Sequence, residues 1–382
     1  MSAGAGGAID AVDAELLPWW RPIAALLDAG GRPLVFDAHT HIGQHDPDRQ
    51  HQTAAELLAG LKPLGARAAT FPMQEPGGYP AANDELIAIA AASSGRLVAY
   101  CRVDPREDAV AEARRCLDAG ARGIKLHPRA ERFSLDEPAI EGLAALADER
   151  RVPILIHAGR GIPALGRDAL RLAADYPGAH LILAHAAVSD LAWLWRELPA
   201  HPNLLIDTAW WSPGDLIELF TLVPAGQIVW ASDSPYGRPL TSAVMHLRYA
   251  LQAGVGVEAL RSIAGGQMAR LLAGEELARF DRAPGEADRL HPHLERIVSH
   301  LTAAIGAALY DGDHLELVSL ALLACEVDAD DEHAELIAAV AALLRRAGEL
   351  TGADPDVRFP RSVRLLVATL AIARTPAAPL PA

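Results

Sequence analysis

Residues 34–43 read LVFDAHTHIG, a short apolar run that leads into two histidines, His39 and His41. Side chains alternate across a β-strand, so imidazoles at positions i and i+2 point to the same side of the sheet. Similar apolar runs with a polar residue at the carboxyl end recur along the chain. Their recurrence indicates both the architecture and the place where the chemistry gathers.

Eight β-rich apolar runs alternate with stretches of helical apolar spacing, such as residues 108–119 and 139–149. The runs are residues 34–37, 66–71, 97–101, 123–126, 152–156, 181–184, 204–207 and 228–231. An open doubly wound sheet would alternate similarly, but it would not need chemistry at nearly every strand end. We therefore predict an α/β fold, a (β/α)8 TIM barrel, over residues 33–282.

The segments on either side of the predicted barrel lack strand patterns. Residues 1–32 are expected to be an N-terminal segment with a short helix. After residue 285, apolar residues at helical spacing predict roughly four helices, a helical appendage over residues 286–375. Residues 376–382 are rich in Pro and Ala, and we expect a flexible tail there.

The composition restricts the kinds of partner. The formal net charge is -15 and no long basic run occurs, which argues against a nucleic-acid partner. Cys101, Cys116 and Cys325 are widely spaced and fit a reducing compartment. The N-terminus does not resemble a signal peptide, and no run of about 18 apolar residues predicts a membrane span. We expect a cytoplasmic protein with a small-molecule substrate, and the sequence leaves homo-oligomerisation open.

Three more predicted strands end on residues that bind metals. The runs ILIH, LILAH and IVWASD end on His157, His185 and Asp233. Active sites of TIM barrels lie at the carboxyl ends of the strands, so these side chains and the first histidine pair predict a cation site suited to zinc. A second His-x-His pair, His291 and His293, has no strand before it. We interpret that pair as solvated residues near a helix cap.

Six stretches together point to one enzyme family. In chain order, over about residues 34–275, they are DAHTHIG, RGIKLHP, PILIHAG, LILAHA, NLLIDTA and WASDSPYG. With them the chain resembles the amidohydrolase superfamily, in particular the amidohydrolase-related branch of hydrolases and non-oxidative decarboxylases. The resemblance implies one divalent cation, zinc or alternatively manganese, held by His39, His41, His157 and Asp233. It also implies that His185 polarises the substrate, transfers a proton or completes the coordination, and that Asp233 moves a water proton to the leaving group.

Four further polar residues near predicted strand ends have competing interpretations. In some superfamily members a lysine at the position of Lys125 is carbamylated and bridges two metals. We favour a lysine that pairs with a carboxylate or contacts the substrate, so a second metal is expected only if Lys125 is carbamylated. His127 binds substrate or lines the barrel mouth, and Arg160 clamps a substrate carboxylate or forms a surface salt bridge. Asp207 orients His185 or a substrate, or caps a turn.

Trp210, Trp211 and Tyr236 follow the last two predicted strands. They form an apolar wall for the substrate or pack the rim of the barrel.

The resemblance leaves two reactions open. The leading hypothesis is a hydrolase that attacks an ester, lactone or amide with a metal-activated water, and we prefer it because the barrel is compact. The rival is a non-oxidative decarboxylase that uses the same ligands on a conjugated or aromatic carboxylic acid. A non-catalytic ligand-binding or assembly protein on the same barrel is a third hypothesis. We disfavour it because unused buried imidazoles would cost desolvation free energy.

Overall fold

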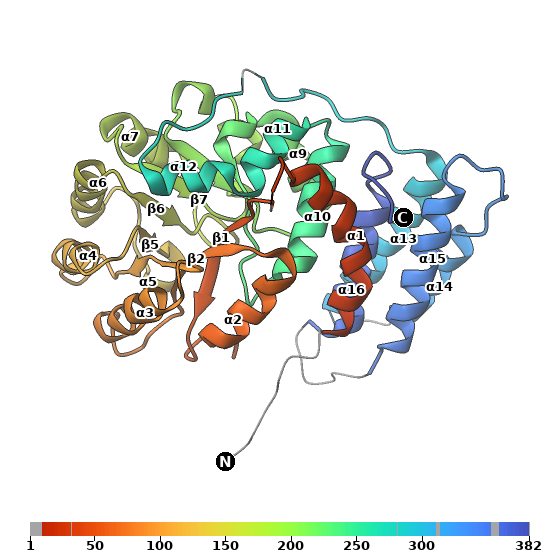
Figure 1. Cartoon of the computed structure of the whole chain (residues 1–382), viewed down its shortest axis with the longest axis horizontal. Helices are drawn as coiled ribbons and strands as arrows, with labels where there is room; N and C mark the ends of the chain where they lie inside the picture. Colours follow the sequence, from red (N-terminus) through yellow and green to blue (C-terminus); the bar gives the residue numbers. More distant parts are fainter. Residues whose placement is uncertain (1–9, 32, 281, 311–313, 353–358, 382) are drawn as a thin grey trace, which may run out of the picture.

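The computed structural model describes residues 10–31, 33–280, 282–310, 314–352 and 359–381. In these residues parallel strands alternate with helices, as Figure 1 shows. The strands are β1 Phe36–Ile42, β2 Arg67–Pro72, β3 Leu97–Ala99, β4 Cys101–Arg102, β5 Ile124–Leu126, β6 Pro153–Ile156, β7 His180–Leu183, β8 Leu204–Asp207 and β9 Ile228–Val229. Their order in the two sheets is β1-β2-β3 and β4-β5-β6-β7-β8-β9.

Backbone hydrogen bonds join the two sheets into a closed barrel. β3 and β4 are two parts of one barrel strand, interrupted at Tyr100, whose N–H still donates to the carbonyl of Thr70 at 2.9 Å. At the other seam, the N–H of Ala38 donates to the carbonyl of Trp230 at 3.0 Å. Eight strand positions therefore surround one axis, and the predicted (β/α)8 barrel is confirmed.

Alternation along each strand separates the barrel core from the helix layer. On β6, Leu155 belongs to the core cluster inside the barrel, whereas Ile154 and Ile156 pack in the cluster beneath the helices. Both faces of such a strand are buried, which explains why the strand sequences are apolar runs and not alternating patterns.

β1 departs from strict alternation after Asp37, where it has one residue more than the facing part of β2. Such a β-bulge changes the phase of the side chains. Phe36 lies in the barrel core before the bulge. After it, His39 and His41 also lie inward, with ring centroids 5.1 and 4.5 Å from that of Phe71. The bulge therefore turns both histidines toward the barrel mouth.

Helices surround the barrel and fill the connections between its strands. They are α2 Ala54–Leu61, α3 Pro80–Ala92, α4 Ala109–Asp118, α5 Pro128–Glu131, α6 Pro138–Arg150, α7 Gly166–Asp175, α8 Leu191–Leu194, α9 Pro213–Leu222, α10 Pro239–Gln252, α11 Val257–Arg261 and α12 Gln267–Ala273. Among the described residues, no helix combines the length and hydropathy that crossing a membrane requires.

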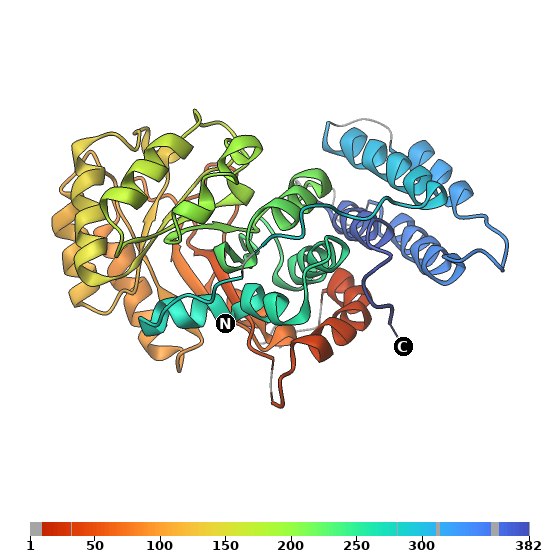
Figure 2. The same cartoon turned by 90° about the horizontal axis from the view of Figure 1, so that it is seen from above.

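The remaining helices form the appendage at one end of the molecule. They are α13 Pro292–Leu309, α14 Leu315–Ala324, α15 Ala334–Glu349 and α16 Arg361–Ala373. The N-terminal helix α1, Ala11–Leu27, packs on α10 and also contacts α16, and α10 contacts α16 directly. Figures 1 and 2 show α1 and α10 between the barrel strands and the appendage.

The C-terminal tail is held in place, contrary to the flexible tail expected from its composition. The buried guanidinium of Arg248 on α10 donates to the hydroxyl and carbonyl of Thr375 at 2.9 and 3.0 Å, and to the carbonyl of Pro379 at 2.8 Å. The N–H of Ala377 donates to Gln252 at 2.9 Å. Composition missed this because the donors come from a distant helix.

Candidate active site

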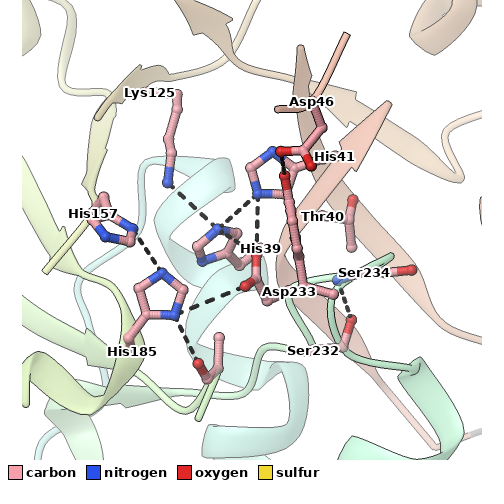
Figure 3. Close-up of polar contacts among 12 residues, drawn as sticks. His39, Thr40, His41, Asp46, Lys125, His157, His185, Ser232, Asp233 and Ser234 are labelled. Atoms are coloured by element: carbon pink, nitrogen blue, oxygen red, sulfur yellow. Dashed lines mark hydrogen bonds and ion pairs between the residues drawn. The ribbon is translucent and has the colours of Figure 1, made fainter. Parts of the chain in front are cut away.

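Polar side chains from six strands converge at the carboxyl ends of the barrel strands, as Figure 3 shows for most of them. All are buried or half-buried. They are His39 and His41 on β1, Lys125 on β5, His157 after β6, His185 after β7, Asp207 at the end of β8 and Asp233 after β9. The strand-end residues singled out in the sequence therefore lie in one place.

Three ligand atoms form a nearly equilateral triangle. The Nε2 atoms of His39 and His41 are 3.2 Å apart, and each lies 3.1 Å from Oδ1 of Asp233. Ligands bound ~2.0–2.2 Å from one cation lie roughly 3.0–3.5 Å from one another in tetrahedral or octahedral geometry. The triangle has the ligand spacing of a mononuclear divalent site.

Asp207 sets the orientation of His39. Nδ1 of His39 donates to Oδ2 of Asp207 at 2.8 Å, which leaves the lone pair of a neutral His39 on Nε2, facing the triangle. Oδ1 of Asp207 accepts the N–H groups of His185 and Ala209 at 2.8 and 2.9 Å. Asp207 thus acts on His39 through its side chain, and it caps the turn after β7 through the backbone of His185.

His157, His185 and the carbonyl of Ala209 form a chain of hydrogen bonds, and the carbonyl determines the tautomers of both histidines. The carbonyl of Ala209 can only accept, so Nδ1 of His185 donates to it at 2.8 Å. Nε2 of a neutral His185 then accepts from Nδ1 of His157 at 2.9 Å. Nε2 of His157 is left with a lone pair, and it is buried without a hydrogen-bond partner among the described residues. That bare nitrogen leaves His157 able to bind a metal, and His185 groups with His39 and Asp233, whose ligand atoms lie within 4.8 Å of one another and of one ring nitrogen of His185.

Burial and neighbouring charges set the ionisation states of the site. Burial and Lys125 would lower the pKa of His39, but Asp233 and Asp207 outweigh them and raise it, so a cation that binds His39 displaces a proton from it. Burial lowers the pKa of His41 to about 3 and that of His157 well below its usual value, so both imidazoles are neutral. Burial alone would raise the pKa of Asp233, but His39 and His41 outweigh it and hold this pKa well below its ordinary value. Neutral imidazoles and an ionised carboxylate are the forms that bind cations.

Lys125 is fully buried beside the triangle. Its Nζ lies 3.4 Å from Nε2 of His39 and 4.6 Å from the ring centroid of Phe71. Burial lowers the pKa of Lys125 to about 7. Within the described residues it forms no ion pair with a carboxylate, so the pairing favoured from the sequence is absent.

His127 and Arg160 lie at the mouth, further from the triangle. The ring of His127 stacks on that of His157 with centroids 4.0 Å apart, and its Nδ1 accepts the N–H of Ala130 at 3.3 Å, where α5 begins. Arg160 is exposed on the loop after β6 and lines the cavity. The surface salt bridge that we considered for Arg160 does not form with any described residue.

A cavity of about 770 Å³ opens above the triangle, and its wall carries many cationic groups. The exposed arginines of the barrel mouth are Arg129, Arg132, Arg160 and Arg238, and none of them forms an ion pair with a described carboxylate. The carboxylates of Asp10, Asp46, Asp48 and Asp233 line the same cavity, and the cationic side chains outnumber them there. Only Arg160 was singled out from the sequence, although Arg129 and Arg238 directly follow the motifs RGIKLHP and WASDSPYG.

The aromatic residues predicted near the mouth also line the cavity. Trp210 and Trp211 lie with ring centroids 6.4 Å apart, and the indole N–H of Trp210 donates to Asp215 at 2.6 Å. The ring centroids of Tyr236 and His41 lie 5.4 Å apart in an edge-to-face arrangement. The hydroxyl of Tyr236 donates to Asp46, and this hydrogen bond joins the loops after β9 and β1. These side chains supply apolar surface next to the cationic groups.

Comparison with known proteins identifies the family. The amidohydrolase family model matches residues 12–272, more than half of the chain. The chain belongs to the amidohydrolase family. The match includes every residue of the triangle and the whole barrel core, but it ends before the helical appendage begins. No curated protein matches the chain.

Solved structures place this amidohydrolase-family chain among TIM barrels. A dihydroxybenzoic acid decarboxylase from Polaromonas sp. JS666, with bound manganese and the inhibitor 2-nitroresorcinol, has a TM-score of 0.51 at 16% identity; 63% of this chain and 97% of that chain are covered. A 5-carboxyvanillate decarboxylase from Sphingomonas paucimobilis has a TM-score of 0.50 at 17% identity, and the match covers 63% of this chain and 99% of that chain. A TIM-barrel protein from Bordetella bronchiseptica has a TM-score of 0.50 at 15% sequence identity, and the match covers 63% of this chain and 98% of that chain. At these identities the likeness shows the fold.

Proposed function

We propose that this amidohydrolase-family protein is a metal-dependent hydrolase of a small organic anion that contains an ester, lactone or amide bond. The observation that carries the proposal is the ionised carboxylate of Asp233, whose Oδ1 belongs to the triangle while its Oδ2 lies 3.9 Å from Nδ1 of His185. Hydrolysis begins when a base takes a proton from the attacking water, and the ionised carboxylate of Asp233 can accept that proton.

His39, His41, His157 and Asp233 would hold the cation, with zinc expected and manganese as the alternative. When bound, a divalent cation supplies Lewis acidity that makes water acidic near neutral pH. Oδ1 of Asp233 faces the triangle, while Oδ2 lies 3.9 Å from Nδ1 of His185. Asp233 is therefore placed to accept a proton from water and to deliver it to the leaving group, with His185 beside it.

The arginines of the mouth support an anionic substrate. Arg160 on the loop after β6 and Arg129 on α5 line the same cavity. Arg129 approaches Gly161 closely enough that a Cβ there would lie 3.2 Å from its Nε. A planar guanidinium binds a carboxylate through two parallel hydrogen bonds, which would fix the position of the substrate as well as attract it.

Decarboxylation of an aromatic or conjugated acid is the second candidate, and Lys125 is the observation that favours it. Loss of carbon dioxide leaves a carbanion that must be protonated. With a pKa lowered by burial to about 7, Lys125 is partly protonated at neutral pH and lies 3.4 Å from Nε2 of His39. Three of the solved structures with similar folds are decarboxylases by name, among them a 2,6-dihydroxybenzoate decarboxylase.

Metal analysis and product analysis together test the proposal. Protein purified without chelators should hold zinc or a similar cation, and His39→Ala should lose about one equivalent. The loaded enzyme is then incubated with carboxylate-bearing esters, lactones and amides, and with aromatic carboxylic acids. Hydrolysis products support the proposal, and carbon dioxide released without hydrolysis would replace it by the decarboxylase. A wild type that binds no metal, even after zinc or manganese is added, contradicts both and favours a ligand-binding or assembly protein.

A further inference from the structure

One wall of the cavity comes from the helical appendage and not from the barrel. The residues that α13, α16 and the segment before α16 contribute are Ile305, Leu309, Phe359, Arg361, Val363, Arg364 and Val367. Most are apolar, and the spacing of Val363 and Val367 places them on one face of α16. The family match ends at residue 272, so this wall lies outside the part of the chain that the family shares.

Arg361 and Arg364 are the charged members of this wall, and the contacts of Arg364 indicate a ligand. One of its nitrogens, Nη2, pairs with Asp10 at 3.0 and 3.3 Å, where α1 begins. Its other terminal nitrogen, Nη1, is enclosed and has no hydrogen-bond partner among the described residues. A shielded guanidinium N–H without an acceptor is destabilising, and an anionic ligand at this position would relieve it.

We propose that the appendage wall binds the remote part of the substrate, and that the substrate is an amphipathic organic anion. Its hydrocarbon body would lie against α13 and α16, an anionic group would pair with Arg364, and the reacting group would reach the triangle. The reacting end rests on the proposed function, but the remote end does not. A cavity of about 770 Å³ has room for such a molecule, since drug-sized ligands occupy ~300–1,000 Å³.

Two fluorescent probes that differ by one charge test this wall. 8-Anilinonaphthalene-1-sulfonate carries a sulfonate on an apolar body, and N-phenyl-1-naphthylamine is the same body without the charge. With zinc-loaded protein, Arg364→Met should weaken sulfonate binding about tenfold or more, the loss expected for one charge-assisted contact, and leave the neutral probe unchanged. Val367→Asp should weaken both probes. Binding does not depend on turnover, so an absence of hydrolysis leaves this test intact.

Asp10→Asn is the matched variant, because it breaks the same ion pair from the other side. If Arg364 binds the anion, Asp10→Asn releases the guanidinium and strengthens sulfonate binding, opposite to Arg364→Met. Arg364→Lys should retain most of the affinity. Equal affinities for the sulfonate in wild type, Arg364→Met and Asp10→Asn would overturn the proposal, as would parallel losses in both variants.

An independent cluster within the appendage carries a second proposal. His291 and His333 are the N-cap residues of α13 and α15, and the Nε2 atoms of both lie 3.6 Å from Oε1 of Glu332. His293 stands beside them, with its ring centroid 4.8 Å from that of His291 and its Nδ1 2.6 Å from Asp331. The His-x-His pair that we interpreted as solvated residues thus gathers with a third imidazole.

We propose that His291, His333 and Glu332 bind a second divalent cation, of the zinc class, which clips the starts of α13 and α15 together. Two imidazoles and a carboxylate form a common zinc ligand set, and a fourth position would remain for water. The three ligand atoms lie within 4.8 Å of one another. A second equivalent of metal would then reside here and would not implicate a carbamylated Lys125.

Metal counts in single variants separate the two sites. With zinc in modest excess followed by desalting, His333→Ala and His39→Ala should each hold about one equivalent less than wild type, because each removes a ligand of a different site. His300→Ala, on α13 but outside the cluster, should match wild type. A wild-type count in His333→Ala would overturn the proposal. Cobalt absorption checks it, since the tetrahedral band should shrink in His333→Ala.

Discussion

At the residue scale, Asp207 serves three donors at once. An asparagine has one acceptor oxygen, so Asp207→Asn cannot accept both from Nδ1 of His39 and from the N–H groups of His185 and Ala209. Because such partners of metal ligands contribute a factor of ~10–100 to affinity, we expect zinc affinity to fall by about that factor. Competition with a chromophoric chelator measures it. Asp168→Asn on α7 is the control, and unchanged affinity in Asp207→Asn would contradict this role.

His246 gives a residue-scale prediction about pH. Its Nε2 donates to the carbonyl of Trp210 at 2.9 Å, and its Nδ1 lies 3.0 Å from the hydroxyl of Thr208. Burial lowers the pKa of His246 to about 4, against an ordinary value of 6.5. Between these values the unfolded chain binds the extra proton, so this residue's contribution to stability is complete above pH 6.5 and is lost as the pH falls toward about 4.

His246→Gln removes this titration. Melting temperatures measured from pH 7.5 to 4.5 should fall more steeply for wild type than for His246→Gln, although other buried histidines titrate in both proteins. Parallel curves would show that the ionisation of His246 does not contribute.

At the element scale, the interrupted third strand depends on a glycine of its neighbour. A Cβ at Gly123, just before β5, would lie 2.8 Å from the ring of Tyr100, the residue between β3 and β4. Since overpacking a filled core costs ~1–3 kcal/mol, we expect Gly123→Ala to lower the free energy of unfolding by that amount. Urea unfolding measures it. Gly306→Ala on α13, where a Cβ would meet nothing within 4 Å, should instead gain roughly 0.5–1 kcal/mol.

At the scale of the whole molecule, α10 connects the barrel to the chain's end. Arg248→Met would leave the carbonyls of Thr375 and Pro379 without their donors, and each buried unsatisfied group costs ~1–3 kcal/mol. We expect a lower melting temperature and faster proteolysis of the C-terminal tail. Arg374→Met removes only an exposed ion pair with Glu295 at 3.4 Å and should change little. Equal behaviour of the two variants would mean that the tail is held by other contacts.

Sequence periodicity anticipated the barrel and the gathering of strand-end residues, because both follow from local rules. An apolar run bounded by helical segments indicates a buried strand wherever it occurs, and all parallel strands in a barrel end at the same rim. His157, His185 and Asp233 could be singled out on that basis. The same reasoning placed His39 and His41 on one side of their strand, although only the bulge after Asp37 makes that side the inner one.

Contacts between distant segments needed the tertiary structure. Asp207 meets His39 across 168 residues, and Arg364 meets Asp10 across 354. No local pattern encodes such pairs, because they depend on how closed strands and packed helices bring backbones together. For the same reason the composition of the last residues indicated a free tail, where packing produced a bound one. In this protein, therefore, local periodicity specifies the strands and helices and the barrel rim at which the chemistry occurs. Long-range packing decides the tautomers of the histidines, the arginines that line the cavity and the wall that the appendage contributes.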